Sequence, residues 1–188
     1  MLSQISNSKM VNPSLTNLQD NELIQRGFSL SLCKSEEEKK ELYELFLEII
    51  KEGDSYPQTL PYSFEEFLNY FFAKGSVVLI CKENQKIVGG FYLKPNFPGK
   101  SSHIGNCGYI VNKDYRGQKI GFHLGKCSID MAKELGYKSI IFNLVIKENI
   151  RAVKLWEKLG FKIIGTIPDA IKINNDKFHD AYIMFLNL

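Results

Sequence analysis

The clearest chemical feature of this sequence is a short turn that combines glycine with two cations. Tyr115 to Gly121 lies between a predicted strand and a predicted helix. The start of a helix offers unpaired backbone N–H groups and about half a unit of positive charge. Gly117 lets a ligand approach the backbone closely, and Arg116 and Lys119 add positive charge. The turn suits a pyrophosphate, although solvated cations on an ordinary strand-to-helix turn would give the same pattern.

The spacing of this turn does not match the common nucleotide-binding loops. Its glycines form neither GxxxxGK[ST] nor GxGxxG, so the sequence does not favour an ATP-binding or a dinucleotide-binding site.

Two asparagines inside apolar strands form a second candidate group. Asn106 lies in the predicted strand 104–111, and Asn143 lies in the predicted strand 139–146. An amide in such an apolar run is costly unless it is hydrogen-bonded, so Asn143 is either a satisfied core amide or a functional group. An amide cannot act as a general base, but it can position an amine or water, or polarise a carbonyl.

Alternating strands and helices must position these groups. Strands are predicted at 28–33, 77–81, 87–93, 104–111, 139–146, 161–167 and 181–188, and helices at 36–52, 64–74, 120–135 and 149–159. The first two helices each begin with a capping box, Ser followed three residues later by Glu. The order predicts an α/β fold, with a mixed sheet and helices on both faces.

One crossover must be parallel, because a helix joins strand 104–111 to strand 139–146. Ligands of open α/β sheets bind beyond the carboxyl ends of such strands. The chemistry is therefore predicted near Val111 and Ile146.

Composition and charge limit the other classes of function. The 188 residues are 44% hydrophobic and carry a net charge of +3, which suits one globular domain and does not indicate nucleic-acid binding. No apolar run approaches the roughly 20 residues of a membrane span, and no signal peptide precedes the domain. The four cysteines and three histidines lack zinc-site spacing, so we predict no metal, buried free thiols and a cytoplasmic location.

The N-terminal residues differ in composition from the rest. Residues 1–26 are rich in Ser, Asn and Gln and are predicted to form an arm, mobile unless it docks, ahead of a single domain at 27–188. The residues that could dock are Leu15, Leu18, Leu23 and Ile24.

Two motifs together resemble the GCN5-related N-acetyltransferase (GNAT) family. Residues 108–111 followed by 116–121 are similar to its cofactor motif, Arg/Gln-x-x-Gly-x-Gly/Ala. Residues 149–152, Trp156 and residues 160–161 are similar to its second motif, Asn-x-x-Ala, an aromatic residue, then Gly-Phe. The strand order agrees with the family as well, so the resemblance covers nearly the whole predicted domain.

The resemblance implies acetyl-CoA as the acetyl-donor cosubstrate and a splay between two central parallel strands. The pantetheine arm would lie in the splay, and its pyrophosphate would meet the turn. Asn149 would bond the arm, besides serving as a helix N-cap. The implied cofactor-binding residues are Ile110, Val111, Arg116, Gly117, Gln118, Lys119, Ile120, Gly121, Asn149 and Trp156.

Three positions depart from the family pattern. Lys119 replaces the middle glycine of the first motif, and we expect it to take ordinary helical dihedral angles at little cost. Trp156 stands where many members keep the tyrosine that protonates the departing thiolate; an indole is not a usable acid, and plain packing is its alternative role. Asn106 stands where many members carry a glutamate base. We therefore predict Asn106 and Asn143 as the catalytic residues, which orient the amine and polarise the thioester.

The predicted acceptor is a small amine. Tyr56 and Pro57 lie in a proline-containing loop where the family forms its acceptor pocket, and with Asn106 they are the predicted substrate-binding residues. This loop and the asparagines resemble most the fungal acetyltransferases for azetidine-2-carboxylate and other proline analogues, which implies a cyclic imino acid or amino acid. Two alternatives are acetylation of a protein lysine or N-terminus, and a non-catalytic CoA-binding module. A homodimer is left open.

Overall fold

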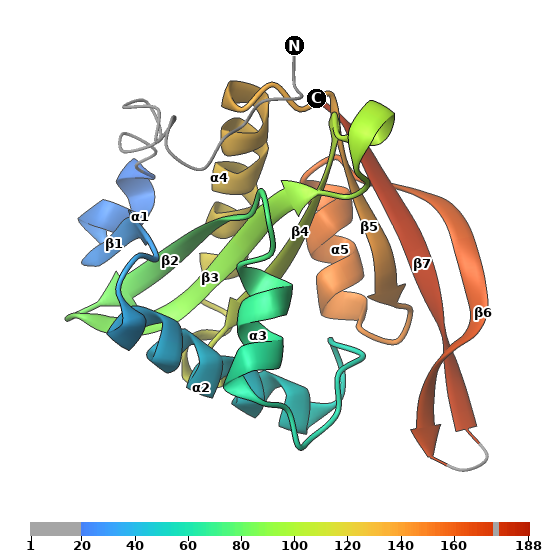
Figure 1. The fold of residues 1–188 in the computed structure, drawn as a ribbon, viewed down its shortest axis with the longest axis horizontal. Helices are drawn as coiled ribbons and strands as arrows, with labels where there is room; N and C mark the ends of the chain where they lie inside the picture. The colour runs from blue at the N-terminus through green and yellow to red at the C-terminus, as the bar shows by residue number, and fades with distance from the viewer. Residues whose placement is uncertain (1–19, 175–176) are drawn as a thin grey trace.

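A seven-stranded sheet runs through the computed structural model, which describes residues 20–174 and 177–188 (Figure 1). The strands are β1 Phe28–Leu32, β2 Val77–Glu83, β3 Lys86–Pro95, β4 Ile104–Val111, β5 Ser139–Ile146, β6 Lys162–Asn174 and β7 Lys177–Asn187. Their order in the sheet is β1-β2-β3-β4-β5-β7-β6. The β4–β5 pairing is parallel and the other pairings are antiparallel, so the predicted mixed sheet is confirmed.

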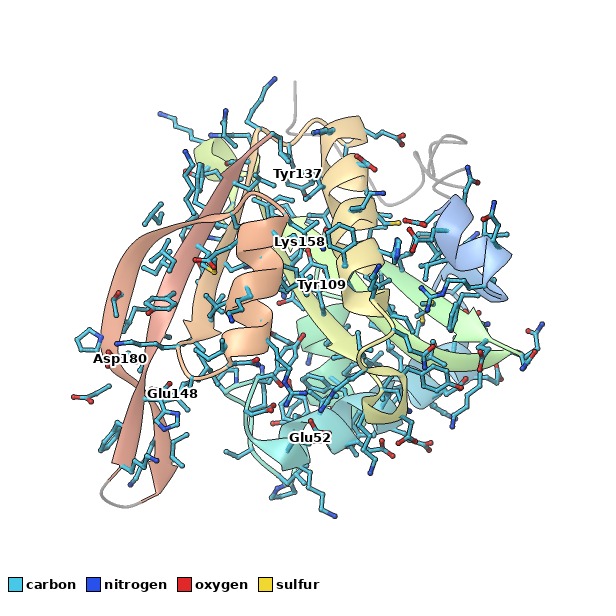
Figure 2. The ribbon with its side chains drawn as sticks, turned by 180° about the vertical axis from the view of Figure 1, so that it is seen from behind. Glu52, Tyr109, Tyr137, Glu148, Lys158 and Asp180 are labelled. Atoms are coloured by element: carbon cyan, nitrogen blue, oxygen red, sulfur yellow. The ribbon has the colours of Figure 1, made fainter. Side chains whose placement is uncertain are left out.

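Helices cover both faces of the sheet. They are α1 Asn21–Gln25, α2 Glu36–Glu52, α3 Phe64–Phe71, α4 Ile120–Glu134 and α5 Ile150–Lys158, with short 3-10 turns at Gly99–Ser101 and Lys113–Tyr115. Helices α2 and α3 lie on one face, and α4 and α5 lie on the other (Figures 1 and 2). The apolar core is accordingly split into two clusters, one on each face, as expected for a sheet between two helical layers.

Both predicted capping boxes are present. Ser35 and Ser63 accept hydrogen bonds from the N–H groups of Glu38 and Glu66, and the two glutamates accept bonds in return. Helix α2 ends at Gly53, whose φ of 72° is the left-handed conformation that glycine adopts without strain. The start of α2 and the start of α3 are thus determined locally, whatever the helices later contact.

Glu38 also joins α2 to the sheet, and this predicts a loss of stability in acid. Its carboxylate accepts bonds from the N–H groups of Lys34 and Ser35 and from Lys82 Nζ at 2.8 Å. Burial raises the pKa of Glu38, but these donors outweigh burial and bring it from 4.5 to about 2. The stability that ionised Glu38 contributes is therefore present above pH 4.5 and is lost as the pH falls toward 2.

Glu38→Gln should accordingly lower the free energy of unfolding by about 1–2 kcal/mol at neutral pH, because the charge-assisted bonds are weakened. At pH 3 the difference in free energy of unfolding between this variant and the wild type should be smaller. Urea denaturation at both pH values measures it, with Glu44→Gln as the control on the exposed face of the same helix. If the difference in free energy of unfolding were equal at both pH values, the loss of stability in acid could not be assigned to Glu38.

The last hairpin is longer than predicted. The predicted strands 161–167 and 181–188 become β6 and β7, which extend the pairing to Asn174 and Lys177. Pro168 and Asp169 interrupt the alternating apolar pattern of the sequence. In the structure they lie within a register shift of the β6–β7 pairing, between Ile167 and Ile171. A β-bulge bends a strand without ending it, so pairing resumes beyond the proline.

The end of the predicted N-terminal arm is docked in the structure. Asp20 caps α1, Leu23 is fully buried, and Asp20 Oδ2 lies 2.7 Å from Nδ1 of the buried His123 in α4. Leu23 therefore docks as the sequence allowed, whereas Ile24 is 40% exposed. Leu15 and Leu18 lie outside the described residues.

The four cysteines are buried free thiols, as predicted. Burial raises the pKa of each thiol to about 12, so none is a ready nucleophile. None of the helices in the described part of the chain is long and apolar enough to cross a membrane.

Candidate active site

The two central parallel strands separate almost as soon as they meet. β4 and β5 pair only at Ile104–Ser139 and Gly105–Ile140, although each strand continues for several more residues. A cavity of about 370 Å³ opens where they part. This separation is the splay that the sequence predicted, and it leaves backbone groups of both strands without a strand partner.

All four predicted catalytic and substrate-binding residues meet around this cavity, together with two of the predicted cofactor-binding residues. Its lining includes Tyr56, Pro57, Asn106, Asn143, Asn149 and Trp156. The turn 116–121, Ile110 and Val111 do not contribute to the lining. The predicted site is thus divided between a cavity in the splay and a separate turn at the start of α4.

The turn presents free backbone N–H groups. α4 has no side-chain N-cap, and no backbone hydrogen bond is recorded for the N–H groups of Gly117 to Gly121. Gly117 has a φ of 79°, so the backbone curls as a glycine allows. Unpaired N–H groups at a helix start are the donors that a phosphate accepts from, so the turn fits a pyrophosphate.

Lys119 does not take the ordinary helical dihedral angles that the sequence suggested. Its φ is 60° and its ψ is 10°, which is the left-handed region. The middle glycine of the family motif therefore marks a position of positive φ, and a lysine there is strained by about 1–2 kcal/mol. The low-cost expectation for Lys119 was wrong because sequence alone did not reveal the turn's handedness.

Arg116 is already paired in this structure. Its guanidinium lies 2.5 Å from the carboxylate of Glu52. Glu52, which is labelled in Figure 2, is the last residue of α2. Arg26 donates to the carbonyl of Gln118 at 2.8 Å, which further ties the turn to the N-terminal half of the chain. A phosphate that bound to Arg116 would therefore have to compete with Glu52.

The peptide groups of β4 alternate between β3 and the splay. Asn112 N–H donates to Val88 in β3, and Asn96 N–H donates to Ile104 in β4, so even-numbered β4 residues face β3. The peptide groups of Tyr109 and Val111 then face the splay, and those of Ile110 do not. We therefore expect Val111 rather than Ile110 to offer the backbone bonds that the family resemblance implied.

Asn106 occupies the point where the strands part. Its Nδ2 donates to the carbonyl of Ile141 at 2.9 Å, and its Oδ1 lies 3.3 Å from the Tyr92 hydroxyl. The side chain thus bridges β4 and β5 just beyond their last paired residues. One N–H of the amide and one lone pair of its oxygen remain available toward the cavity.

Asn143 is not the core amide that its apolar neighbours suggested. It is exposed within β5, because the splay removes the neighbouring strand at this position. Its Nδ2 donates to Asn96 Oδ1 at 2.6 Å. Asn143 and Asn106 do lie on one cavity, but no direct bond between them is recorded.

Tyr56 reaches deep into the site from the proline-containing loop. Its hydroxyl donates to the carbonyl of Tyr109 at 3.0 Å, and its ring packs edge-on against Phe46. A Cβ on Gly108 would lie 2.8 Å from this hydroxyl and 2.5 Å from the Tyr92 ring. Gly108 is therefore the residue that makes room for both tyrosines.

Asn149 links the same loop to α5. Its Oδ1 accepts from Ala152 N–H at 3.1 Å, which is the predicted N-cap, and its Nδ2 donates to the carbonyl of Asp54 at 3.1 Å. The start of the loop is thus held at two points, by the bond from Asn149 to Asp54 and by the bond from Tyr56 to Tyr109.

Trp156 is buried and packs in an aromatic group on the α5 face. Its ring centroid lies 4.6 Å from that of Tyr109 and 4.8 Å from that of Phe142. Figure 2 shows Tyr109 between α4 and α5, where its hydroxyl lies 2.6 Å from Ser128 Oγ. These contacts give Trp156 a packing role.

The cavity residues that sequence reasoning missed include Tyr70, Tyr92 and Lys94. Lys94 stands directly opposite Asn106 in the β3–β4 register, so an antiparallel pairing of the two strands would have pointed to it. His103 is exposed and does not line the cavity. Within residues 20–174 and 177–188 no cluster of three His, Cys, Asp or Glu side chains could hold a metal ion.

Comparison with known proteins agrees with this geometry. A model of the acetyltransferase (GNAT) family matches residues 39–161. N-acetyltransferase aca1 of Schizosaccharomyces pombe is 33% identical over 151 residues, which span 71% of this chain and 72% of that protein. The chain belongs to the GNAT family of acetyltransferases. It is therefore an acetyltransferase that uses acetyl-CoA as acetyl donor, and the free N–H groups of its turn and the open splay fit that cosubstrate.

Two solved structures share the fold. A GCN5-related N-acetyltransferase from Kribbella flavida is 26% identical, with a TM-score of 0.80 over 87% of this chain and 99% of that one. Salmonella typhimurium yncA, whose structure contains acetyl-CoA, is 17% identical, with a TM-score of 0.76 over 86% of this chain and 94% of that one. At this identity the second likeness supports the fold alone.

Proposed function

We propose that this GNAT enzyme transfers the acetyl group of acetyl-CoA to the amine of a small molecule, with cyclic imino acids and other amino acids among its best acceptors. The observation that carries the proposal is the cavity of about 370 Å³ in the splay. Sites for small molecules have volumes from about 300 to 1,000 Å³. A cavity at the low end of this range suits a compact acceptor.

The lining of the cavity argues against a protein acceptor. A lysine or N-terminal substrate is cationic and would be favoured by an acidic groove. No Asp or Glu is among the described residues that line the cavity. The same lack of carboxylates leaves no evident general base in the cavity, so water must take the proton of the amine.

The residues of the chain then divide the work as follows. The N–H groups of the 117–121 turn hold the pyrophosphate, and Val111 bonds the arm in the splay. Acetyl-CoA supplies a thioester whose carbonyl carbon the amine attacks. Asn106 and Asn143 orient the amine and polarise that carbonyl, a role for preorganised neutral donors.

Transfer is direct in this scheme. The only thiol that lines the cavity belongs to Cys107, whose pKa burial raises to about 12, so a covalent acetyl-enzyme is not favoured. The C–N bond forms as the C–S bond breaks. Water takes the proton of the amine and returns one to the sulfur, because Trp156 cannot serve as an acid.

Cosubstrate binding provides the first test. CoA at 100 times its Kd should stabilise the protein by about 2.7 kcal/mol, because it binds only the native state. Arg116→Ala should lower the affinity for CoA by about 10-fold or more, because a charge-assisted bond to the cosubstrate is lost. Glu52→Gln should raise the affinity for CoA by about 2–5-fold, because it removes the carboxylate that now pairs with Arg116.

The affinity for CoA is measured from melting temperatures at increasing CoA concentration, for the wild type, Arg116→Ala and Glu52→Gln. If millimolar CoA did not raise the melting temperature, the proposed cosubstrate site would be wrong. If the two variants bound CoA with equal affinity, the proposed competition between Glu52 and phosphate would be wrong. Thiol release with a panel of imino acids, amino acids and peptides then tests the acceptor. Turnover of peptides alone would overturn the small-molecule proposal.

A further inference from the structure

One charged side chain stands alone in the acceptor cavity. Among the described residues that line it, Lys94 is the only Asp, Glu, Lys or Arg. Its ammonium lies 4.6 Å from the ring centre of Tyr70 and 4.5 Å from that of Tyr92, and it donates to the Tyr70 carbonyl at 2.7 Å. No carboxylate of the described chain lies within 4.0 Å of it.

The surroundings of Lys94 leave part of its charge unmatched. Lys94 is half-buried, so its ammonium has lost part of its hydration, and this burial lowers the pKa of Lys94. Two aromatic faces and one carbonyl compensate for some of that loss. An ammonium has three N–H donors, and one bond is recorded here, so donors remain for a ligand.

The position of Lys94 relates it to the reacting groups. Lys94 pairs with Asn106 across β3 and β4, which places both side chains on the same face of the sheet. Asn106 in turn marks the point where β4 and β5 part. An acceptor whose amine reaches the splay therefore has Lys94 beside it, at the cavity wall formed by β3.

We propose that Lys94 binds the carboxylate of the acceptor, and that the enzyme thereby selects α-amino and α-imino acids over simple amines of the same shape. This rests on the proposed function and names the group that the acceptor must carry. An ammonium and a carboxylate in a partly desolvated site form a charge-assisted bond that a neutral carboxamide cannot match.

The same contact accounts for reaction without a general base. In a free amino acid the carboxylate stabilises the neighbouring ammonium group. When Lys94 pairs with the carboxylate, that stabilisation falls and the amine gives up its proton to water more readily. Lys94 thus acts as a specificity-determining residue, and it promotes the neutral amine without taking a proton itself.

The test compares acceptors that differ only in charge. Proline and alanine are each paired with their carboxamides, and initial rates are measured by thiol release with wild type, Lys94→Met and Lys94→Arg. Lys94→Met should raise KM for the carboxylates by about 30–100-fold. It should change KM for the carboxamides by less than about 3-fold, because a neutral carboxamide offers the Lys94 ammonium no charge to pair with. Lys94→Arg should retain the preference for the carboxylates.

Lys86→Met is the matched control, since Lys86 is exposed at the opposite end of β3 and does not line the cavity. The melting shift with CoA should be the same in Lys94→Met as in the wild type. The role of Lys94 would be wrong if Lys94→Met raised KM equally for carboxylates and carboxamides. It would also be wrong if the wild type preferred the carboxamides as acceptors. A protein that binds no CoA and acetylates no amine would instead overturn the proposed function.

Discussion

Replacing Asn143 by alanine is expected to lower kcat by about 10²–10³-fold, as the loss of one preorganised donor does elsewhere. The melting temperature should hardly change, because Asn143 is exposed and its one recorded bond is to another side chain, Asn96. Its position on β5 at the cavity puts it within the splay, where the thioester must lie. A contribution made mainly in the transition state appears in kcat and not in cosubstrate affinity.

Two further variants separate catalysis from packing. Asn96→Ala removes the partner of Asn143 and should cost much less in kcat, since Asn96 would act only by orienting Asn143. Asn106→Ala should lower both kcat and stability, because its amide also bonds the Ile141 carbonyl between the strands. Steady-state rates and thermal melts of the three proteins check this. Full activity in Asn143→Ala would remove Asn143 from the mechanism.

Phe46→Ala is expected to lower the free energy of unfolding by about 3–5 kcal/mol. Phe46 is fully buried in α2, and its ring contacts those of Tyr56 at 5.0 Å, Phe71 at 5.2 Å and Phe67 at 5.5 Å. Truncation removes dispersion contacts and leaves a cavity that the surrounding rings fill only in part. For a protein of this size the melting temperature should fall by about 10 °C.

The same change should reach the acceptor. Phe46 supports Tyr56, and it also lies against Tyr70, so two cavity residues lose their backing. KM for the acceptor should rise while CoA affinity stays near the wild-type value, because the turn at the start of α4 lies elsewhere. Phe46→Leu keeps more of the packing if alanine prevents folding, and Phe97→Ala, at a side chain 51% exposed, is the control. An unchanged acceptor KM in a destabilised Phe46→Ala would show that the aromatic cluster does not support the site.

The local elements were determined by the sequence. The capping boxes at Ser35 and Ser63, the apolar spacing of α4 and the apolar run of β5 each depend on neighbours within a few residues. The motif at 116–121 and the Asn149 cap are local in the same sense. This is why the α/β order, the parallel β4–β5 pair and the GNAT family could be predicted before the fold was known.

The tertiary structure decided how these elements meet. Lys94 and Tyr70 enter the site through strand register and helix packing, which bring together residues far apart in the chain. The positive φ of Lys119, the pairing of Arg116 with Glu52 and the exposure of Asn143 follow from the path of the backbone and from the splay. A residue's neighbours along the chain do not determine which distant groups will face it. The charge and the free donors of the acceptor cavity therefore became apparent only in three dimensions.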